Sequence, residues 1–463
     1  MQRNLMLVLF ILLFGVVSCG DDDDDDGGAS TADDDDSGND DDESAVDDDN
    51  TDDDNDETDD DSTSSDDDDD NDDSSPEECE PPPFRSCRDV DTSEGTPMVS
   101  DLKWIVPSEM MPDEVREQPG NNNLDIVEHD CRLFFAFRAA PYHFASAQAT
   151  IYVLSTTDEE NWEYETRINL ETDVREPRLW SFDGKLFLYF AVLGDNPAAF
   201  EPQGMMYSEY LEPGRWSRPK SLYEEGFIPW RTKVVDGVPY MVGYVGGENI
   251  YEMTEGGDPM TVHWLTTSDG VTLEPVIEDQ PVVITGGGSE TDFVILDDGS
   301  LVAVARNEAG DENGFGMNIC RAGAEDLGTW ECVMDPKKYD SPLMFKHKNR
   351  AYLIGRRNVT ETGNYDLGMD DLPLEDQRME YELDYWNQPK RCSLWEVDLE
   401  TREVSFLLDL PSAGDTCFAG ITKICENQYL VYNYTSPLDD LDISWNEGQT
   451  GDTLIYSVVL TMP

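Results

Sequence analysis

The sequence predicts an all-β protein that folds as a six-bladed β-propeller of four-stranded blades. Three observations indicate this fold: a repeated strand–turn–strand pattern, the spacing of its turns, and a further strand after each hairpin. The repeats span 124–138, 177–192, 229–244, 291–306, 342–356 and 419–434. Their turn centres, from Cys131 to Asn427, lie about 53, 53, 62, 50 and 78 residues apart. A propeller blade takes roughly 40–60 residues, so each repeat predicts one blade.

The remaining strands support this count. Third strands follow the hairpins at 149–154, 204–210, 261–267, 316–322, 393–399 and 453–460. The chain ends just after the sixth of these, so we expect 101–108 ("DLKWIVPS") to close the last blade and cover its edge. The alternative is a β-sandwich, a fold that rarely shows so long a super-period.

Residues 1–19 have the features of an export signal. Arg3 precedes an apolar run, Leu5–Val17, that is short for a membrane span. The run ends in "VVSC", which resembles the lipobox of bacterial lipoproteins. This resemblance implies cleavage before Cys19, lipidation of its thiol and amine, and a lipid-anchored protein of the bacterial cell envelope. Gly20 favours the outer membrane; an ordinary secretory signal is the alternative.

A highly acidic segment, 20–75, separates this leader from the rest of the chain. Residues 21–75 hold 32 Asp or Glu and no Lys or Arg, with almost nothing apolar to bury. Such a composition predicts a disordered, self-repelling tether. From residue 76 onward, 71 acidic residues face 29 basic ones. This balance gives no basic footprint for nucleic acid, so we expect none as a partner.

The cysteine count is even once Cys19 is set aside. Eight cysteines remain, which in an exported protein predicts disulfides. Cys320 and Cys332 lie on neighbouring strands of one blade and are expected to pair. Cys79 and Cys87 suggest a local pair in a linker at 76–100, ahead of the propeller at 101–463. The pairing of the other four stays open. The four histidines lack ligand spacing, so neither a metal nor a cofactor is predicted.

Charged residues gather where the first strand of each blade begins and the second ends, at one end of the propeller near its axis. The acidic ones are Glu176, Glu290 and Asp415, and the basic ones are Arg138, Arg178, Arg231, Arg306, Arg356 and Arg357. Such arginines can pin loops through ion pairs. As a cluster they also suggest an anion-binding pocket, because guanidinium recognises carboxylate through two parallel hydrogen bonds.

One stretch of this rim resembles the bacterial sialidases. In "ETDFVILDDGSLVAVAR" (290–306), a glutamate precedes a strand and an arginine follows the hairpin, as in that family. "STTDEENW" (155–162) resembles a degenerate form of their Asp-box turn, and "TTSDGVTLE" (266–274) and "EDLGTW" (325–330) resemble further remnants. The resemblance covers about 120–463 and implies a six-bladed propeller.

The resemblance also implies roles for individual residues. In sialidases three arginines clamp the substrate carboxylate, a tyrosine activated by a glutamate attacks the anomeric carbon, and an aspartate is the acid/base. Glu290 would be the partner of the tyrosine and Arg306 one clamp arginine. Arg356 or Arg357 would be another.

Two departures from the family pattern leave the activity open. "NNNLDIV" (121–127) stands where the first clamp arginine is expected, and Phe418 stands where the nucleophilic tyrosine is expected. Glu176, Glu290 and Asp415 would then carry the chemistry as carboxylates of an ordinary glycoside hydrolase. The aromatic residues of an insertion at 359–390 either stack on sugars or belong to a covering loop.

These observations predict a surface-tethered, sialidase-like glycoside hydrolase that acts on extracellular, acidic glycans. Arg138, Arg178, Arg231, Arg306 and Arg356 would orient the anion. The expected partners are a glycan and, through the lipid anchor, a membrane, with the protein a monomer. A non-catalytic propeller that binds glycan or protein is the alternative, and a purely structural envelope lipoprotein is a third.

Overall fold

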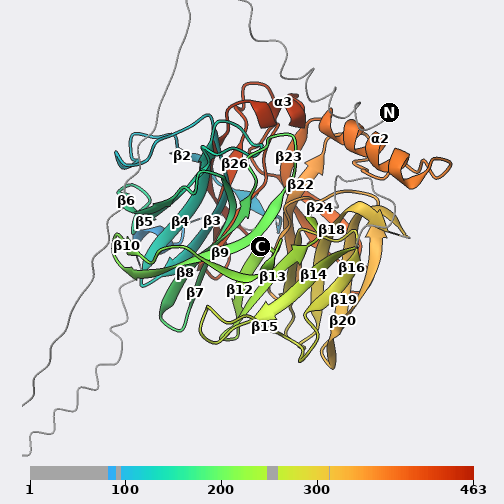
Figure 1. Ribbon diagram of the computed structural model, residues 1–463, viewed down its shortest axis with the longest axis horizontal. Helices are drawn as coiled ribbons and strands as arrows, with labels where there is room; N and C mark the ends of the chain where they lie inside the picture. Colours follow the sequence, from blue (N-terminus) through green and yellow to red (C-terminus); the bar gives the residue numbers. More distant parts are fainter. Residues whose placement is uncertain (1–81, 90–94, 248–258, 312) are drawn as a thin grey trace, which may run out of the picture. The chain divides into compact units, whose positions relative to one another are not determined.

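A computed structural model describes residues 82–89, 95–247, 259–311 and 313–463. These residues form six antiparallel sheets arranged as the blades of a propeller, which confirms the predicted fold class (Figure 1). Three short helices accompany the strands: η1 (Pro83–Arg85), α2 (Leu374–Trp386) and α3 (Trp445–Thr450). The predicted leader, Cys19, the acidic segment and Cys79 lie outside the described residues.

The strands follow one another from blade to blade. Blade one holds β3 (Gly120–His129), β4 (Arg132–Ala140), β5 (Thr150–Thr156) and β6 (Glu163–Ile168). Blade two holds β7 (Asp173–Phe182), β8 (Lys185–Leu193) and β9 (Pro202–Glu212), with β10 (Arg215–Trp216) and β11 (Lys220–Glu225) both paired to β9. Blade three holds β12 (Ile228–Val235), β13 (Val238–Val245) and β14 (Met260–Thr266), with β15 (Glu274–Pro275) and β16 (Val282–Gly286) both paired to β14.

The second half of the ring repeats this order. Blade four holds β17 (Thr291–Ile295), β18 (Leu301–Asp311), β19 (Gly314–Gly323) and β20 (Asp326–Asp335). Blade five holds β21 (Leu343–His347), β22 (Arg350–Asn358), β23 (Lys390–Val397) and β24 (Val404–Asp409). Blade six holds β25 (Gly420–Cys425), β26 (Gln428–Thr435) and β27 (Leu454–Thr461).

The inner strands are buried on both faces because each blade packs between two others. Eight of the nine residues of β4 are buried, whereas β11 at an outer edge is mostly exposed. A strand buried on both faces is a nearly continuous apolar run, and "LFFAF" in β4 has this form. The first hairpin of blade two turns at Gly184, whose φ of +67° favours glycine.

The N-terminal strand closes the ring, as the sequence predicts. β2 (Lys103–Val106) pairs antiparallel with β27, and Trp104 lies opposite Tyr456. A shorter strand, β1 (Met98–Val99), pairs with the other end of β27, so blade six begins slightly before residue 101. Ile105 and Val106 are fully buried. Strands from the two ends of the propeller therefore share one sheet, which covers the edge of β27 at the seam.

The disulfides confirm one predicted pair and correct another. Cys320 and Cys332 face each other on β19 and β20 and are bonded. The predicted Cys79–Cys87 pair is wrong, because Cys87 is bonded to Cys425, 338 residues away. The segment that carries Cys87 packs on blade six, where the backbone of Arg88 exchanges two hydrogen bonds with the side chain of Gln428. A third bond joins Cys392 to Cys417.

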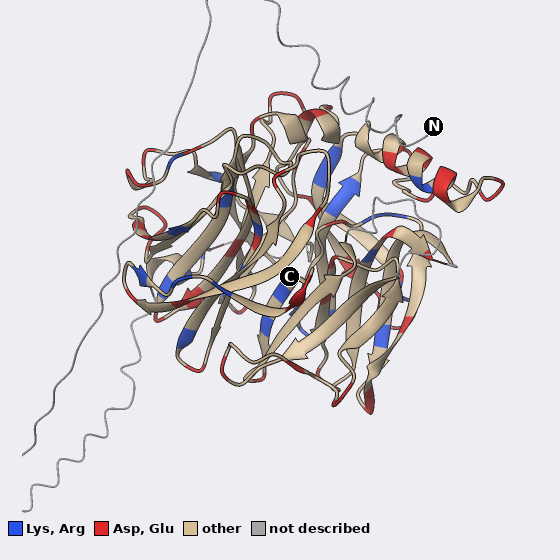
Figure 2. Ribbon diagram, viewed as in Figure 1, with Lys and Arg blue, Asp and Glu red and all other residues tan. Residues whose placement is uncertain are grey.

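Charge is distributed unevenly over the described residues. Acidic residues lie on many loops and along α2, whereas several basic residues lie on strands (Figure 2). No helix in the described ranges is long and apolar enough to cross a membrane.

The closing strand gives the first prediction. Ile105→Ala removes a fully buried side chain of the main core cluster. We expect the free energy of unfolding to fall by about 2–4 kcal/mol, because the change leaves a cavity. Urea denaturation followed by tryptophan fluorescence measures it. Val238→Ala, at an exposed position, is the control and should change stability by less than about 0.5 kcal/mol. Equal effects of the two substitutions would contradict the assigned role of β2.

Candidate active site

A backbone bulge recurs where first strands approach the axis. The register of β3 shifts between Asn122 and Leu124, and that of β7 shifts between Arg175 and Arg178. The bulged residues Asn123 and Glu176 have φ values of +40° and +52°. Bulges re-aim side chains and are frequent beside functional sites. Here they bring the two side chains together, and Asn123 Nδ2 donates to Glu176 Oε1 at 3.0 Å.

The blades are joined to one another at this end of the propeller. Arg306 Nη1 donates to Glu290 Oε1 at 2.6 Å, and the other oxygen of Glu290 accepts from the backbone N–H of Ser341 at 2.7 Å. Arg356 Nε donates to the carbonyl of Thr416 at 2.9 Å. The structure therefore places these predicted rim residues in one buried polar cluster that spans several blades.

Two of the predicted substrate-binding arginines bind the protein itself. Arg231 crosses the axis and donates to the carbonyls of Pro342, Ala419 and Ser341, on blades five and six. Burial lowers its pKa to about 10. Arg138 is fully buried and donates to Asp173 at 2.6 Å. These contacts match the loop-pinning interpretation of the rim arginines.

Arg306 and Arg356 belong to a larger ionic network that the sequence did not suggest. Asp340 lies 3.5 Å from Arg306 Nε and 3.4 Å from Arg356 Nη1. Lys338, fully buried, contributes its charge to the same carboxylate at 3.6 Å. Burial opposes ionisation of Asp340, but Lys338 and the two arginines outweigh it and lower its pKa. Asp340 is thus the centre of the network. Arg357, in contrast, pairs with Asp409 at 2.7 Å.

Arg178 and Glu176 differ from these saturated groups. Arg178 Nη1 donates to the carbonyls of Leu124 and Pro177. Its Nε and Nη2 are buried and have no hydrogen-bond partner among the described residues. Glu176 Oε2 is also buried without such a partner. Nη2 and Oε2 lie 3.8 Å apart. Nε and Nη2 form the edge of guanidinium that binds a carboxylate through two hydrogen bonds.

Glu176 and Asp415, the other two predicted catalytic carboxylates, have opposite ionisation behaviour. Burial raises the pKa of Glu176 to about 7, although Arg178 and Arg175 act against it. Burial also opposes ionisation of Asp415, but His143, Arg356 and Trp445 outweigh it and lower its pKa. Below neutral pH the cluster therefore holds one protonated and one ionised carboxyl, the arrangement that acid/base chemistry requires.

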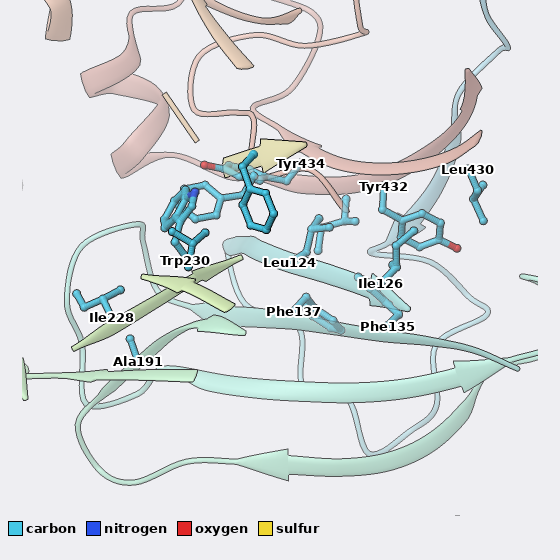
Figure 3. Packing of buried hydrophobic residues seen from close by; sticks show 14 of the residues in the cluster. Leu124, Ile126, Phe135, Phe137, Ala191, Ile228, Trp230, Leu430, Tyr432 and Tyr434 are labelled. Atoms are coloured by element: carbon cyan, nitrogen blue, oxygen red, sulfur yellow. The ribbon is translucent and has the colours of Figure 1, made fainter. Parts of the chain in front are cut away.

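Aromatic rings line the same region. The Trp230 and Phe418 ring centroids are 5.1 Å apart, and Phe418 lies 6.3 Å from Tyr434. Trp230 and Tyr434 lie close together within the buried cluster (Figure 3). The Arg178 guanidinium carbon is 5.1 Å from the centroid of Trp230. An apolar wall of this kind suits the face of a sugar ring.

Asp415 is saturated by donors. It accepts from His143 Nδ1 at 2.7 Å, from the Tyr434 hydroxyl at 3.1 Å and from Trp445 Nε1 at 3.0 Å. Tyr434, whose ring contacts Phe418, thus uses its hydroxyl as a hydrogen-bond donor. Burial raises the pKa of this hydroxyl well above its usual value. A neutral, hydrogen-bonded phenol is a poor nucleophile.

The insertion after β22 covers the rim. Tyr365, Tyr381 and Tyr385 are buried and pack against one another and against Trp445. Tyr365 donates to Glu382 at 2.9 Å, and Lys338 lies 4.0 Å from its ring centroid. The rings face inward, so the contacts match a covering segment rather than an exposed sugar platform.

Two of the three predicted Asp-box remnants fold as turns, whereas the third, 325–330, lies almost wholly in strand β20. Asp158 accepts from the backbone of Glu160 and Asn161, and its pKa falls to about 2 because of these bonds. Asp269 accepts from Val271 and Thr272 in the same way. These carboxylates order loops between third and fourth strands, away from the cluster.

Comparison with known proteins gives a fold and no family. No family model and no curated protein matches the chain. Among solved structures, a protein of unknown function from Dyadobacter fermentans is 14% identical, with a TM-score of 0.53 over 79% of this chain and 99% of that one. A Trypanosoma rangeli sialidase bound to a difluoro sugar acid is 12% identical, with a TM-score of 0.49 over 79% of this chain and 58% of that one. Zg3597, a family 117 glycoside hydrolase from Zobellia galactanivorans, is 12% identical, with a TM-score of 0.37 over 57% of this chain and 86% of that one.

The structural role of Arg231 is testable. Arg231→Met leaves three buried carbonyls without donors, so we expect the free energy of unfolding to fall by about 3–5 kcal/mol. Chemical denaturation measures the loss. Arg350→Met, which breaks a largely exposed pair with Glu396, should cost less than about 1 kcal/mol. A stable Arg231 variant would return this arginine to the set of substrate-binding candidates.

Proposed function

We propose that this protein is a glycoside hydrolase that acts on acidic glycans outside the cell, at the axial cluster around Glu176 and Arg178. The observation that carries the proposal is the paired edge of Arg178, Nε and Nη2, buried without hydrogen-bond partners beside the unsatisfied oxygen of Glu176. Buried polar groups without partners are costly, and here two facing charged groups share this condition, so a ligand that bonded to both would complete the network.

The chemistry of the two groups suits an acidic sugar. A carboxylate of the substrate would accept both hydrogen bonds from the Arg178 edge. Glu176, protonated below about pH 7, would donate its proton to the glycosidic oxygen as the bond to the anomeric carbon breaks. Trp230 and Phe418 would support the apolar face of the ring. Both charged side chains are buried here, so a substrate reaches them only when the side chains above them move.

Glu290 and the remaining arginines have a different part in this proposal. Glu290 is bonded to Arg306 and to the backbone of Ser341, and it raises the pKa of Glu176 as a neighbouring negative charge. It therefore tunes the acid instead of acting on a tyrosine. Asp415, saturated by donors, orients its neighbours.

A non-catalytic glycan-binding propeller is the second candidate, and Phe418 favours it. Phenylalanine stands where the resemblance to sialidases requires the nucleophile, and Tyr434 is engaged with Asp415. A site that kept the arginine edge and the aromatic wall would still bind an acidic sugar.

Turnover by the full-length protein separates the two candidates. We expect hydrolysis of at least one acidic substrate in a panel of chromogenic glycosides that includes sialosides and uronides. Glu176→Gln should lower kcat by about 100- to 10,000-fold while binding persists, because the variant lacks the proton. In the wild type, kcat/KM should fall as the pH rises above about 7, where Glu176 loses its proton.

The matched controls address binding and folding. Arg178→Lys keeps the charge but not the two-bonded edge, so KM for acidic substrates should rise at least tenfold. Glu225→Gln, at an exposed position, should leave the kinetics unchanged. If no substrate is turned over, but acidic sugars bind in a saturable manner that Arg178→Lys weakens, the protein is the binding module instead.

Lipid anchoring at Cys19, in the outer membrane, is part of this proposal and rests on the lipobox-like "VVSC". In a bacterial host, Cys19→Ser should move the protein from the membrane fraction to the soluble fraction and abolish labelling by a fatty-acid analogue, because the acylated thiol is lost. Cys320→Ser, which removes one cysteine of a disulfide, is the control and should retain the label. Unchanged labelling of the Cys19 variant would contradict the anchor.

A further inference from the structure

His143 and Asp415 form a pair of the kind that moves protons. His143 Nδ1 lies 2.7 Å from Asp415 Oδ2, and Asp415 is fully buried. The ionised carboxylate accepts the proton of Nδ1, which fixes the tautomer of the ring. The other nitrogen, Nε2, has no hydrogen-bond partner among the described residues, and the side chain is 14% exposed. Nε2 therefore keeps its lone pair and can accept a proton from a water molecule that binds beside it.

The backbone around His143 is held from several directions. Arg138 donates to the carbonyls of Tyr142 and Phe144, on either side of the histidine. Arg175 Nη2 donates to the carbonyl of His143 at 3.2 Å, and the N–H of His143 donates to Gln449 at 3.0 Å. A side chain fixed by both its backbone and a carboxylate is preorganised for one task.

The pair borders the proposed active site. Arg175, which holds His143, directly precedes Glu176 in β7. Asp415 also accepts from Tyr434, whose ring packs near Phe418. The imidazole thus lies at the edge of the region that contains Glu176, on the loop between β4 and β5.

We propose that His143, positioned by Asp415, is the general base of a single-step hydrolysis that inverts the anomeric carbon. This inference rests on the proposed glycoside hydrolase activity. Phe418 cannot form a covalent intermediate, and Asp415 and Glu290 are each engaged by donors of the protein, so water attacks the substrate directly in this mechanism. Nε2 takes a proton from that water as its oxygen bonds to the anomeric carbon. The glycosidic C–O bond breaks, its electron pair leaves with the oxygen, and that oxygen takes the proton of Glu176. Solvent then carries the proton from His143 back to Glu176.

The pH dependence of the reaction follows from these roles. His143 must be neutral and Glu176 protonated, so kcat/KM should describe a bell-shaped curve. Asp415 is bonded to Nδ1 of the imidazole, and Arg175 is bonded to the backbone carbonyl of His143. Tyr434, Trp445 and Arg356 act on the ring through Asp415. No other charged side chain within the described ranges is bonded to the ring.

Two measurements on the full-length protein test the assignment. Proton NMR of the first product should show the anomer with inverted configuration. His143→Gln should lower kcat by about 100- to 10,000-fold with little change in KM, and the acidic limb of the pH profile should disappear while the basic limb remains. Imidazole added to His143→Ala should restore part of the activity, an effect that a purely structural role would not produce.

His129→Gln is the matched control. His129 also lies beside an aspartate, Asp130, but it is at the far end of β3, where it contacts Ser181. Its substitution should leave the pH profile unchanged. Asp415→Asn, if it folds as judged by urea denaturation, should lower kcat and shift the acidic limb.

The possible failures are distinct. A retained anomer, or a His143→Gln variant with activity within about twofold of wild type and the same pH profile, would overturn the role of His143 and leave the hydrolase proposal intact. Absence of turnover by the wild-type protein on every substrate would overturn the hydrolase proposal, and the role of His143 with it.

Discussion

The structure depends on how charges are paired at the propeller axis. Closing six blades into a ring brings the starts of the first strands together, and the polar groups there lose contact with water. Buried charges are tolerated only when partners satisfy them. Arg231 and Lys233 meet this condition by donating to backbone carbonyls of other blades, Lys233 to Phe293 and Met344 at 2.6 Å each. These two cations join the blades they satisfy, so the closed ring and the buried charges stabilise each other.

The same constraint leaves hydrogen-bonded and incompletely bonded charged groups side by side within one cluster. Arg138, Arg231 and Asp415 have their hydrogen-bonding capacity taken by the protein, whereas Arg178 and Glu176 do not. At Glu176, burial outweighs the opposing charges of Arg178 and Arg175 and raises the pKa, while donors around Asp415 reverse the effect of burial there. Two carboxyls with opposite protonation states thus arise from differences in partners within one buried region.

Much of the fold could be predicted because a repeated hairpin leaves a repeated pattern in the sequence. The closing strand followed from counting strands, and the Cys320–Cys332 bond followed from their positions on neighbouring strands. The Cys87–Cys425 bond could not be inferred, since its cysteines are brought together by docking of a segment 338 residues away. The positions of the rim arginines were predictable, but their partners were not. Backbone carbonyls accept from Arg231, and every residue has a carbonyl, so no sequence signal distinguishes a structural arginine from one that binds substrate. Asp340 and Lys338, just before the fifth repeat, carried no pattern of their own.

Arg138 and Arg175 have a structural role near His143 that the resemblance to sialidases does not suggest. Arg138 and Arg175 bind Asp173 between them, at 2.6 and 2.5 Å, and both also donate to the backbone of the loop that carries His143. They therefore hold a histidine at the rim instead of a substrate carboxylate. Phe418 removes the nucleophile expected from sialidases, and Tyr434 is bound to the aspartate that orients this histidine. In the proposed hydrolysis a site without a protein nucleophile needs a base for water, and the loop fixed by these arginines supplies an imidazole whose Nδ1 is held by Asp415. The same aspartate thus engages Tyr434 and orients the histidine that the proposed mechanism uses as its base.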